Sequence, residues 1–127
     1  MPVMIDGAEL LAFLHVSDLG RAAAFYGGVL GLPVVSQDQF AVVVDADGVE
    51  VRITAVEDRT PAPATVLGWK VPDIEAAVAA LTAAGVGFTR YDGIDQDDAG
   101  VWTTPDGTRV AWFQDPDGNV LSLSQHG

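Results

Sequence analysis

The sequence predicts an α+β fold that is built twice from one unit. Two stretches of similar pattern support this, Ala41 to Thr54 (AVVVDADGVEVRIT) and Val110 to Ser124 (VAWFQDPDGNVLSLS). In each stretch, strand-forming residues flank an Asp-Gly step, which is the sequence signature of a β-hairpin. The two glycines, Gly48 and Gly118, are separated by 118 − 48 = 70 residues. At this offset the apolar positions of the following strands coincide, so the two hairpins are expected to be equivalent.

A second pair of matching segments precedes the hairpins. Asp18 and Asp73 each begin a predicted helix, because an Asp side chain can cap a helix and apolar residues follow at helical spacing. Val16 to Leu19 aligns with Val71 to Ile74 at an offset of 73 − 18 = 55 residues. The growth of the offset, 70 − 55 = 15, places extra residues in the later strands of the second half. Each half therefore reads strand, helix, then three strands.

The expected elements follow the chain in this order. The first half has a strand at Leu10 to Val16, a helix from Asp18 to Gly31, an extended segment at Pro33 to Val35, and strands at Phe40 to Val44 and Glu50 to Val56. The second half has a strand at Val66 to Val71, a helix from Asp73 to Gly85, and strands at Phe88 to Tyr91, Val101 to Thr104 and Val110 to Gln114, before the final strand.

The stretch from 57 to 65 (EDRTPAPAT) breaks every periodicity and is predicted to link the halves. Modules at about 8–56 and 66–125 are each too small to hold a core alone, so residues 1–127 are expected to form a single domain.

Composition restricts the possible functions. The chain has no Cys, which excludes disulfides and thiol nucleophiles. Its 18 acidic and six basic residues give a net charge of −12, which opposes binding to nucleic acid and to anionic membranes. No apolar run reaches the length of a membrane span, and the first ten residues do not resemble a secretory leader. A cytoplasmic location is therefore expected.

Three segments resemble the vicinal oxygen chelate superfamily, which includes glyoxalase I, extradiol dioxygenases and bleomycin-resistance proteins. They are DLGRAAAFYGGVLGL (Asp18 to Leu32), the helix after Asp73, and FQDPDGNVLSL (Phe113 to Leu123). The resemblance covers nearly the whole chain. It implies paired βαβββ modules that form a curled mixed sheet around a cleft, often within a homodimer. It does not imply one particular reaction, because a fold of this kind hosts several.

Strand alternation predicts which side chains face the cleft. In four strands, one set of alternate residues is apolar enough to pack under the helices, and the other set should face the cleft. The cleft set is Leu11, Phe13 and His15; Glu50, Arg52 and Thr54; Val66, Gly68 and Lys70; and Val120, Ser122 and Ser124.

The resemblance also indicates where a metal would be held. Metal-using members take one His, Gln or Glu ligand from each of four strands. In this chain those positions fall at Leu11, Arg52, Val66 and Ser122. Leu and Val have no donor atom, Arg is positively charged, and Ser is a poor ligand when alone. We expect no metal at the family position and no other cofactor.

The expected ligand-binding residues are those polar or aromatic residues that the sequence places in the cleft. They are Phe13, His15, Glu50, Arg52, Lys70, Trp102, Trp112 and Ser122. Arg52 requires either an ion pair, for which Glu50 is the nearest candidate, or an anionic ligand. The two Trp residues could stack on a flat ligand or belong to a core or dimer interface. Core positions are favoured for Phe13, Phe40 and Phe113, and residues 92–100 form either a lid or a plain loop.

The leading functional hypothesis is a metal-independent protein that binds a small hydrophobic or aromatic molecule, similar to the bleomycin-resistance branch. The alternative is a lyase- or dioxygenase-like enzyme, which would use other metal ligands or acid–base chemistry by Glu50 or His15. A third possibility is a degenerate module that only serves as an interaction partner.

Overall fold

The computed structural model describes residues 7–57 and 60–126. Residues 58 and 59 of the predicted linker, and the first six residues of the segment compared with a secretory leader, lie outside the described residues. The chain divides into two compact units, Met1–Arg59 and Thr60–Gly127, called unit 1 and unit 2.

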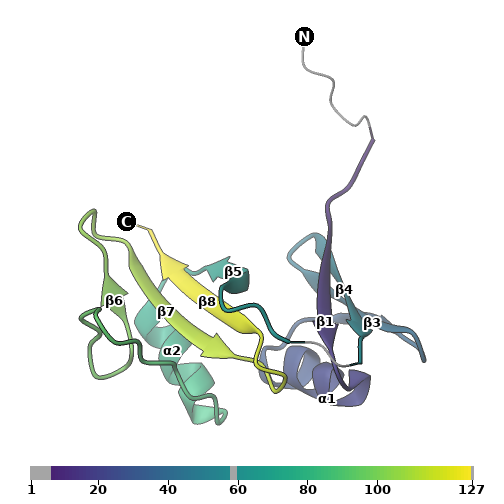
Figure 1. The fold of residues 1–127 in the computed structure, drawn as a ribbon. Helices are drawn as coiled ribbons and strands as arrows, with labels where there is room; N and C mark the ends of the chain where they lie inside the picture. The colour runs from purple at the N-terminus through teal and green to yellow at the C-terminus, as the bar shows by residue number, and fades with distance from the viewer. Residues whose placement is uncertain (1–6, 58–59, 127) are drawn as a thin grey trace. The chain divides into compact units, whose positions relative to one another are not determined.

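Unit 1 is a four-stranded sheet with helical turns on one face (Figure 1). Its elements are β1 (Leu11–Val16), α1 (Leu19–Ala23), η1 (Ala24–Val29), β2 (Val34–Gln37), β3 (Ala41–Ala46) and β4 (Val49–Ala55). The strand order is β1-β4-β3-β2, with β1 parallel to β4 and the other pairs antiparallel. The helix α1 packs against β3 and β4.

Unit 2 repeats this topology (Figure 1). Its elements are β5 (Thr65–Lys70), α2 (Ile74–Ala83), β6 (Trp102–Thr103), β7 (Arg109–Gln114) and β8 (Val120–Gln125). The strand order is β5-β8-β7-β6, with β5 parallel to β8, and α2 packs against β7 and β8. The predicted α+β fold with two tandem βαβββ modules is confirmed.

Both predicted helix caps are present. The Asp18 carboxylate accepts a hydrogen bond of 2.9 Å from the Arg21 N–H, and that of Asp73 accepts one of 3.1 Å from the Ala76 N–H. These bonds satisfy backbone donors that have no partner within the first turn of a helix.

The first helix differs from the prediction because it continues after Ala23 as the π-helix η1 rather than as an α-helix. Its wider turn is closed by the Leu30 N–H, which bonds to the Phe25 carbonyl at 2.9 Å. Phe25 and Tyr26 are adjacent and both are buried, so the wide turn lets two consecutive aromatic side chains enter the core. Gly27 permits the close approach of β2, since a Cβ there would lie 2.8 Å from Val34 Cγ2.

The two Asp-Gly hairpins occupy equivalent positions in the two units but differ in turn length and conformation. In the first, Asp47 and Gly48 have φ angles of 55° and 91°, as a two-residue type I′ turn requires. The second has a longer loop, between Gln114 at the end of β7 and Val120 at the start of β8. Here the extra length is held together by a buried aspartate, Asp115, which is 5% exposed.

The prediction of a strand at Phe88 to Tyr91 is wrong. Only an isolated bridge joins Phe88 to Phe113. The Thr89 N–H also donates to the Trp112 carbonyl of β7 at 2.7 Å, but the Thr89 carbonyl and the Tyr91 N–H bond to the Gln96 side-chain amide instead of to a strand. Its Oε1 accepts from the Tyr91 N–H at 2.7 Å, and its Nε2 donates to the carbonyls of Thr89 at 3.0 Å and Gly100 at 2.8 Å. The inserted residues therefore form a loop that is held by hydrogen bonds between its own residues.

Strand alternation correctly predicts the helix-facing core. Leu14, Val16, Val51 and Ile53 are buried in unit 1, as are Leu121 and Leu123 in unit 2. Phe113 is also buried, as expected of a core residue. Core positions for Phe13 and Phe40 are wrong, because these side chains are 59% and 66% exposed. Phe13 alternates with buried Leu14 and so lies on the open face, while Phe40 belongs to the turn ahead of β3.

Within residues 7–57 and 60–126, none of the helices is long and apolar enough to cross a membrane.

Candidate ligand-binding faces

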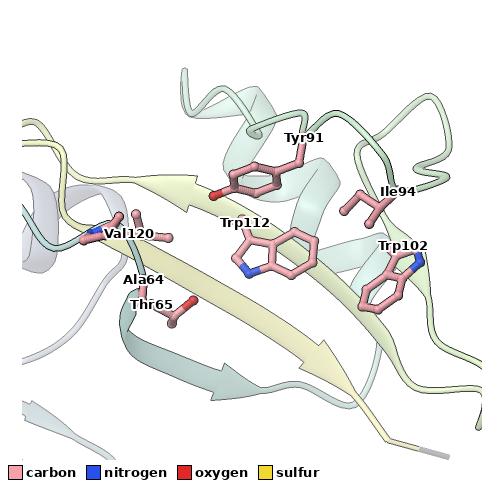
Figure 2. Close-up of a pocket in the computed structure, with 8 residues that line it drawn as sticks. Ala64, Thr65, Tyr91, Ile94, Trp102, Trp112 and Val120 are labelled. Carbon is pink, nitrogen blue, oxygen red and sulfur yellow. The ribbon is translucent and has the colours of Figure 1, made fainter.

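Unit 2 carries an aromatic hollow on the face of its sheet away from α2 (Figure 2). Its volume is ≈ 430 Å³, within the range of small-molecule sites. The residues that line it, which define the Trp hollow, are Pro63, Ala64, Thr65, Tyr91, Ile94, Trp102, Trp112 and Val120.

Three aromatic rings form one wall of the Trp hollow. The rings of Trp102 and Trp112 are stacked, with centroids 6.1 Å apart and planes inclined by 24°. The ring of Tyr91 meets Trp112 edge-on, at a centroid distance of 5.3 Å and an angle of 90° (Figure 2). Such an arrangement offers large π faces to a ligand, and rings in contact with one another need little reorganisation to bind it.

Sheet register places Trp112 at the middle of this face. It pairs with Ser122 on β8, and Ser122 pairs in turn with Gly68 on β5. A Cβ on Gly68 would lie 2.6 Å from Ser122 Oγ, so the serine hydroxyl occupies the space above the glycine. The sheet surface beside the indole ring therefore carries only small side chains, with the Ser122 hydroxyl as its polar group.

Four of the predicted ligand-binding residues belong to unit 2, and two of them line the Trp hollow. Trp102 and Trp112 line the Trp hollow, whereas Lys70 and Ser122 lie on the same face of the sheet but outside the lining.

Sequence reasoning missed two further parts of the wall. Tyr91 was expected in a strand, and the linker gave no sign that Pro63 and Ala64 line a hollow. The Gln96 bonds that place Tyr91 join residues five and seven positions apart through a side chain, which no periodicity reveals.

The face of the unit 1 sheet away from α1, called the open face, carries three neighbouring rows of side chains. Each row, or rung, consists of residues that are paired across β1, β4 and β3. The central rung holds Phe13, Arg52 and Val43. On one side of it lie Leu11, Glu50 and Asp45, and on the other side lie His15, Thr54 and Ala41. His15 Nδ1 and Thr54 Oγ1 are 3.1 Å apart, within hydrogen-bonding distance. The predicted residues Phe13, His15, Glu50 and Arg52 thus share one face.

The expected ion pair between Arg52 and Glu50 is not formed. An ion pair is formed elsewhere, between Arg109 Nη2 and Glu75 Oε1 of unit 2 at 2.9 Å. Arg52 acts on Asp38 only over a longer distance. The pKa of Asp38 is held below its usual value by the backbone N–H groups of Phe40 and Ala41 and, more weakly, by the Arg52 charge.

At the four positions where the sequence predicts the family's metal ligands, the side chains do not fit a metal ion. Leu11 and Val66 expose apolar side chains, 43% and 41% accessible, and Arg52 is a cation that repels one. Only Ser122 brings an oxygen. Across residues 7–57 and 60–126, no three His, Cys, Asp or Glu side chains form a group that could hold a metal ion. Metal independence remains a prediction.

The fold and these two faces belong to a recognisable class. Residues 9–123 match the Glyoxalase/Bleomycin resistance protein/Dioxygenase superfamily. The match spans most of the chain, so the chain belongs to this superfamily. A comparison with curated protein sequences finds no match to this chain.

Solved structures agree with this assignment. A member of the same superfamily from Sphaerobacter thermophilus DSM 20745 is 27% identical, with a TM-score of 0.75 over 97% of this chain and 100% of the other. TnmS3, an antibiotic binding protein from Streptomyces sp. CB03234, is 26% identical, with a TM-score of 0.74 over 98% and 100%. Lactoylglutathione lyase from Agrobacterium tumefaciens shares the fold, at 18% identity and a TM-score of 0.68 over 94% and 93%.

Proposed function

We propose that this protein binds a small aromatic or hydrophobic molecule without changing it chemically, and without a metal. The observation that carries the proposal is the Trp hollow, in which the Trp112 ring contacts both the Trp102 ring and the Tyr91 ring. Aromatic side chains supply large apolar area and favour planar ligands by stacking. The similarity to TnmS3, an antibiotic binding protein, supports the same class of function.

The metal positions support binding rather than metal-assisted catalysis. Replacement of the ligands by Leu11, Arg52, Val66 and Ser122 leaves no set of donors that could activate an oxygen or polarise a carbonyl group.

Tryptophan fluorescence tests the proposal directly. Titration with a panel of neutral planar molecules (2-naphthamide, indole, coumarin and flavone) should give saturable quenching for at least one compound. Mass spectrometry should recover that compound unchanged after long incubation. Trp112→Leu should weaken binding by about tenfold or more, because the ring contributes both apolar area and stacking. Trp69→Phe removes a Trp outside the Trp hollow and should leave affinity unchanged. Absence of binding across the panel would contradict the proposal.

The second candidate is an enzyme of the same superfamily. The His15–Thr54 contact favours it, because an imidazole on an open face can exchange protons with a bound substrate. Elemental analysis after dialysis against nickel, zinc, manganese and iron salts separates the two candidates. One tightly retained metal per chain, or a product formed from the bound compound, would favour the enzyme. Retention of no metal together with unchanged ligand would favour binding alone.

The remaining parts of the proposal are the binding set, the assembly and the location. The set comprises Phe13, His15, Glu50, Arg52, Lys70, Trp102, Trp112 and Ser122, to which the Trp hollow adds Tyr91. A homodimer in the cytoplasm is the proposed state, and nucleic acid and membranes are not proposed as partners, given the net charge of −12.

A further inference from the structure

Arg52 occupies the centre of the open face of unit 1. It is partly buried, and Phe13 on β1 and Val43 on β3 flank it on the same rung. No hydrogen bond or ion pair joins its guanidinium to any of residues 7–57 or 60–126. A guanidinium beside apolar side chains gains most from a planar oxyanion, which can accept two parallel N–H···O bonds.

Two of the nearby carboxylates already have backbone partners. Asp38 accepts hydrogen bonds from the N–H groups of Phe40 at 2.7 Å and Ala41 at 2.9 Å, and Asp45 accepts one from Gly48 at 2.8 Å. Glu50 lies one rung from Arg52 without an ion pair to it. These acids leave the guanidinium donors unused. They also place negative charge around the position, which weakens the binding of any anion and disfavours one that carries more than a single charge.

The apolar side chains on this face define the rest of the ligand. Phe13, which pairs with Arg52, is 59% exposed. Leu11, two residues earlier on the same strand, is 43% exposed. We propose that the open face of unit 1 binds a molecule with a single carboxylate or similar singly charged oxyanion, held by Arg52, and an apolar or aromatic body that covers Phe13. This inference rests on the proposed function and deepens it, because it names the charge class of the small molecule.

A matched pair of probes tests the charge requirement. 2-Naphthoate and 2-naphthamide share one ring system and differ in charge. Proton–nitrogen correlation spectra report separately on the Arg Nε–H groups and on the indole N–H groups of the three Trp residues. We expect 2-naphthoate to shift the Arg52 signal saturably and to bind about tenfold more tightly than 2-naphthamide, since hydrogen bonds between charged groups are stronger than neutral ones.

Three variants identify the group responsible. Arg52→Gln should abolish the preference for 2-naphthoate, and Arg52→Lys should keep part of it because the charge remains. Arg21→Gln is the matched control. It removes the same charge from α1, on the other side of the sheet, where the guanidinium donates to Ser17 Oγ at 2.8 Å. This control should bind like the parent protein, and circular dichroism should show that all three variants are folded.

The outcomes separate this inference from the proposed function. If both probes bind equally and shift Trp102 and Trp112 but not Arg52, the anion site is overturned and the proposed function stands. If 2-naphthoate shifts Arg52 while the Trp signals stay fixed, the anion site is supported and binding in the Trp hollow is contradicted. If neither probe shifts any of these signals at millimolar concentration, both proposals fail.

Discussion

At the scale of single residues, Asp115 and Asn119 show how one buried polar pair can fix a loop. The Asp115 carboxylate accepts from the N–H of Asp117 at 2.9 Å, the N–H of Asn119 at 2.9 Å and Asn119 Nδ2 at 2.8 Å. The two side chains are only 5% and 3% exposed. A buried carboxylate is tolerated only where donors surround it, so the pair is required by the loop rather than by a ligand.

Replacement of Asn119 should therefore destabilise unit 2. Asn119→Ala removes one donor from a buried carboxylate and should lower the free energy of unfolding by about 1–3 kcal/mol. Asn119→Asp places a second carboxylate against Asp115 and should cost more. Urea denaturation of both variants measures the loss. Asp95→Ala changes an exposed loop residue and serves as the control. A loss below about 0.5 kcal/mol for Asn119→Ala, the size expected of an ordinary surface change, would contradict this account.

The sequence predicts some of these residues better than others. Alternation places Arg52 and Ser122 on open faces because the neighbours of each, such as Val51 and Leu121, are apolar and become buried. It does not predict whether Arg52 pairs with Glu50. That outcome depends on side-chain conformations and on the backbone donors that occupy nearby carboxylates, and neither leaves a periodic trace in the sequence.

At the scale of elements, the segment from 89 to 101 is held as a closed loop. Gln96 makes three bonds to its backbone, and Asp97 accepts from the N–H groups of Ala99 and Val101, each at 2.9 Å. Such a network favours a fixed wall over a lid that opens and closes. Tyr91 and Ile94 belong to this wall and line the Trp hollow.

Removal of the Gln96 amide should loosen this wall. Gln96→Ala deletes three hydrogen bonds and should lower the free energy of unfolding by about 1–3 kcal/mol. It should also weaken binding in the Trp hollow several-fold, since Tyr91 is no longer fixed beside Trp112. Hydrogen exchange at the Tyr91 N–H, which bonds to Gln96, should accelerate. Gln114→Ala, at an exposed position of β7, should change none of the three measurements. Unchanged exchange at Tyr91 would show that other contacts hold the loop.

The helices and hairpins were predictable from local chemistry, because caps and Asp-Gly turns act over a few residues. Asp18, Asp73 and Gly48 each play the role that their neighbours suggest. The π-helix and the loop around Gln96 were not predictable in this way. Each is selected by contacts between residues that are distant along the chain or irregularly spaced, such as Gly27 with Val34.

At the scale of the whole molecule, duplication explains why one sequence pattern yields two similar faces with different chemistry. The strand orders β1-β4-β3-β2 and β5-β8-β7-β6 are the same arrangement. The first copy has a cation and a phenylalanine at its centre, Arg52 and Phe13, and the second has stacked indoles. Similar backbones thus carry two surfaces of different chemistry, and we propose that the first selects for charge and the second for flat apolar shape.

Unit 1 also leaves several large apolar side chains exposed to water. Leu10, Val35 and Phe40 are 73%, 56% and 66% exposed. Clusters of large exposed apolar side chains mark surfaces that bind a partner or ligand. We therefore expect a homodimer that buries part of this surface, with a mass about twice the 13.3 kDa of one chain.

Sedimentation equilibrium and light scattering at micromolar concentration measure this association. Phe40→Ser and Val35→Ser should each weaken the dimer by about tenfold or more, because an apolar side chain at an interface contributes more than 1 kcal/mol when it is well packed. Ala79→Ser, on the exposed side of α2, should leave the association unchanged. A parent protein that stays at 13.3 kDa up to about 100 µM would contradict the dimer, given that stable interfaces of standard size bind more tightly than this. The exposed apolar side chains of unit 1 would then be assigned to ligand binding alone. Phe40→Ser should in that case raise solubility without any change in mass.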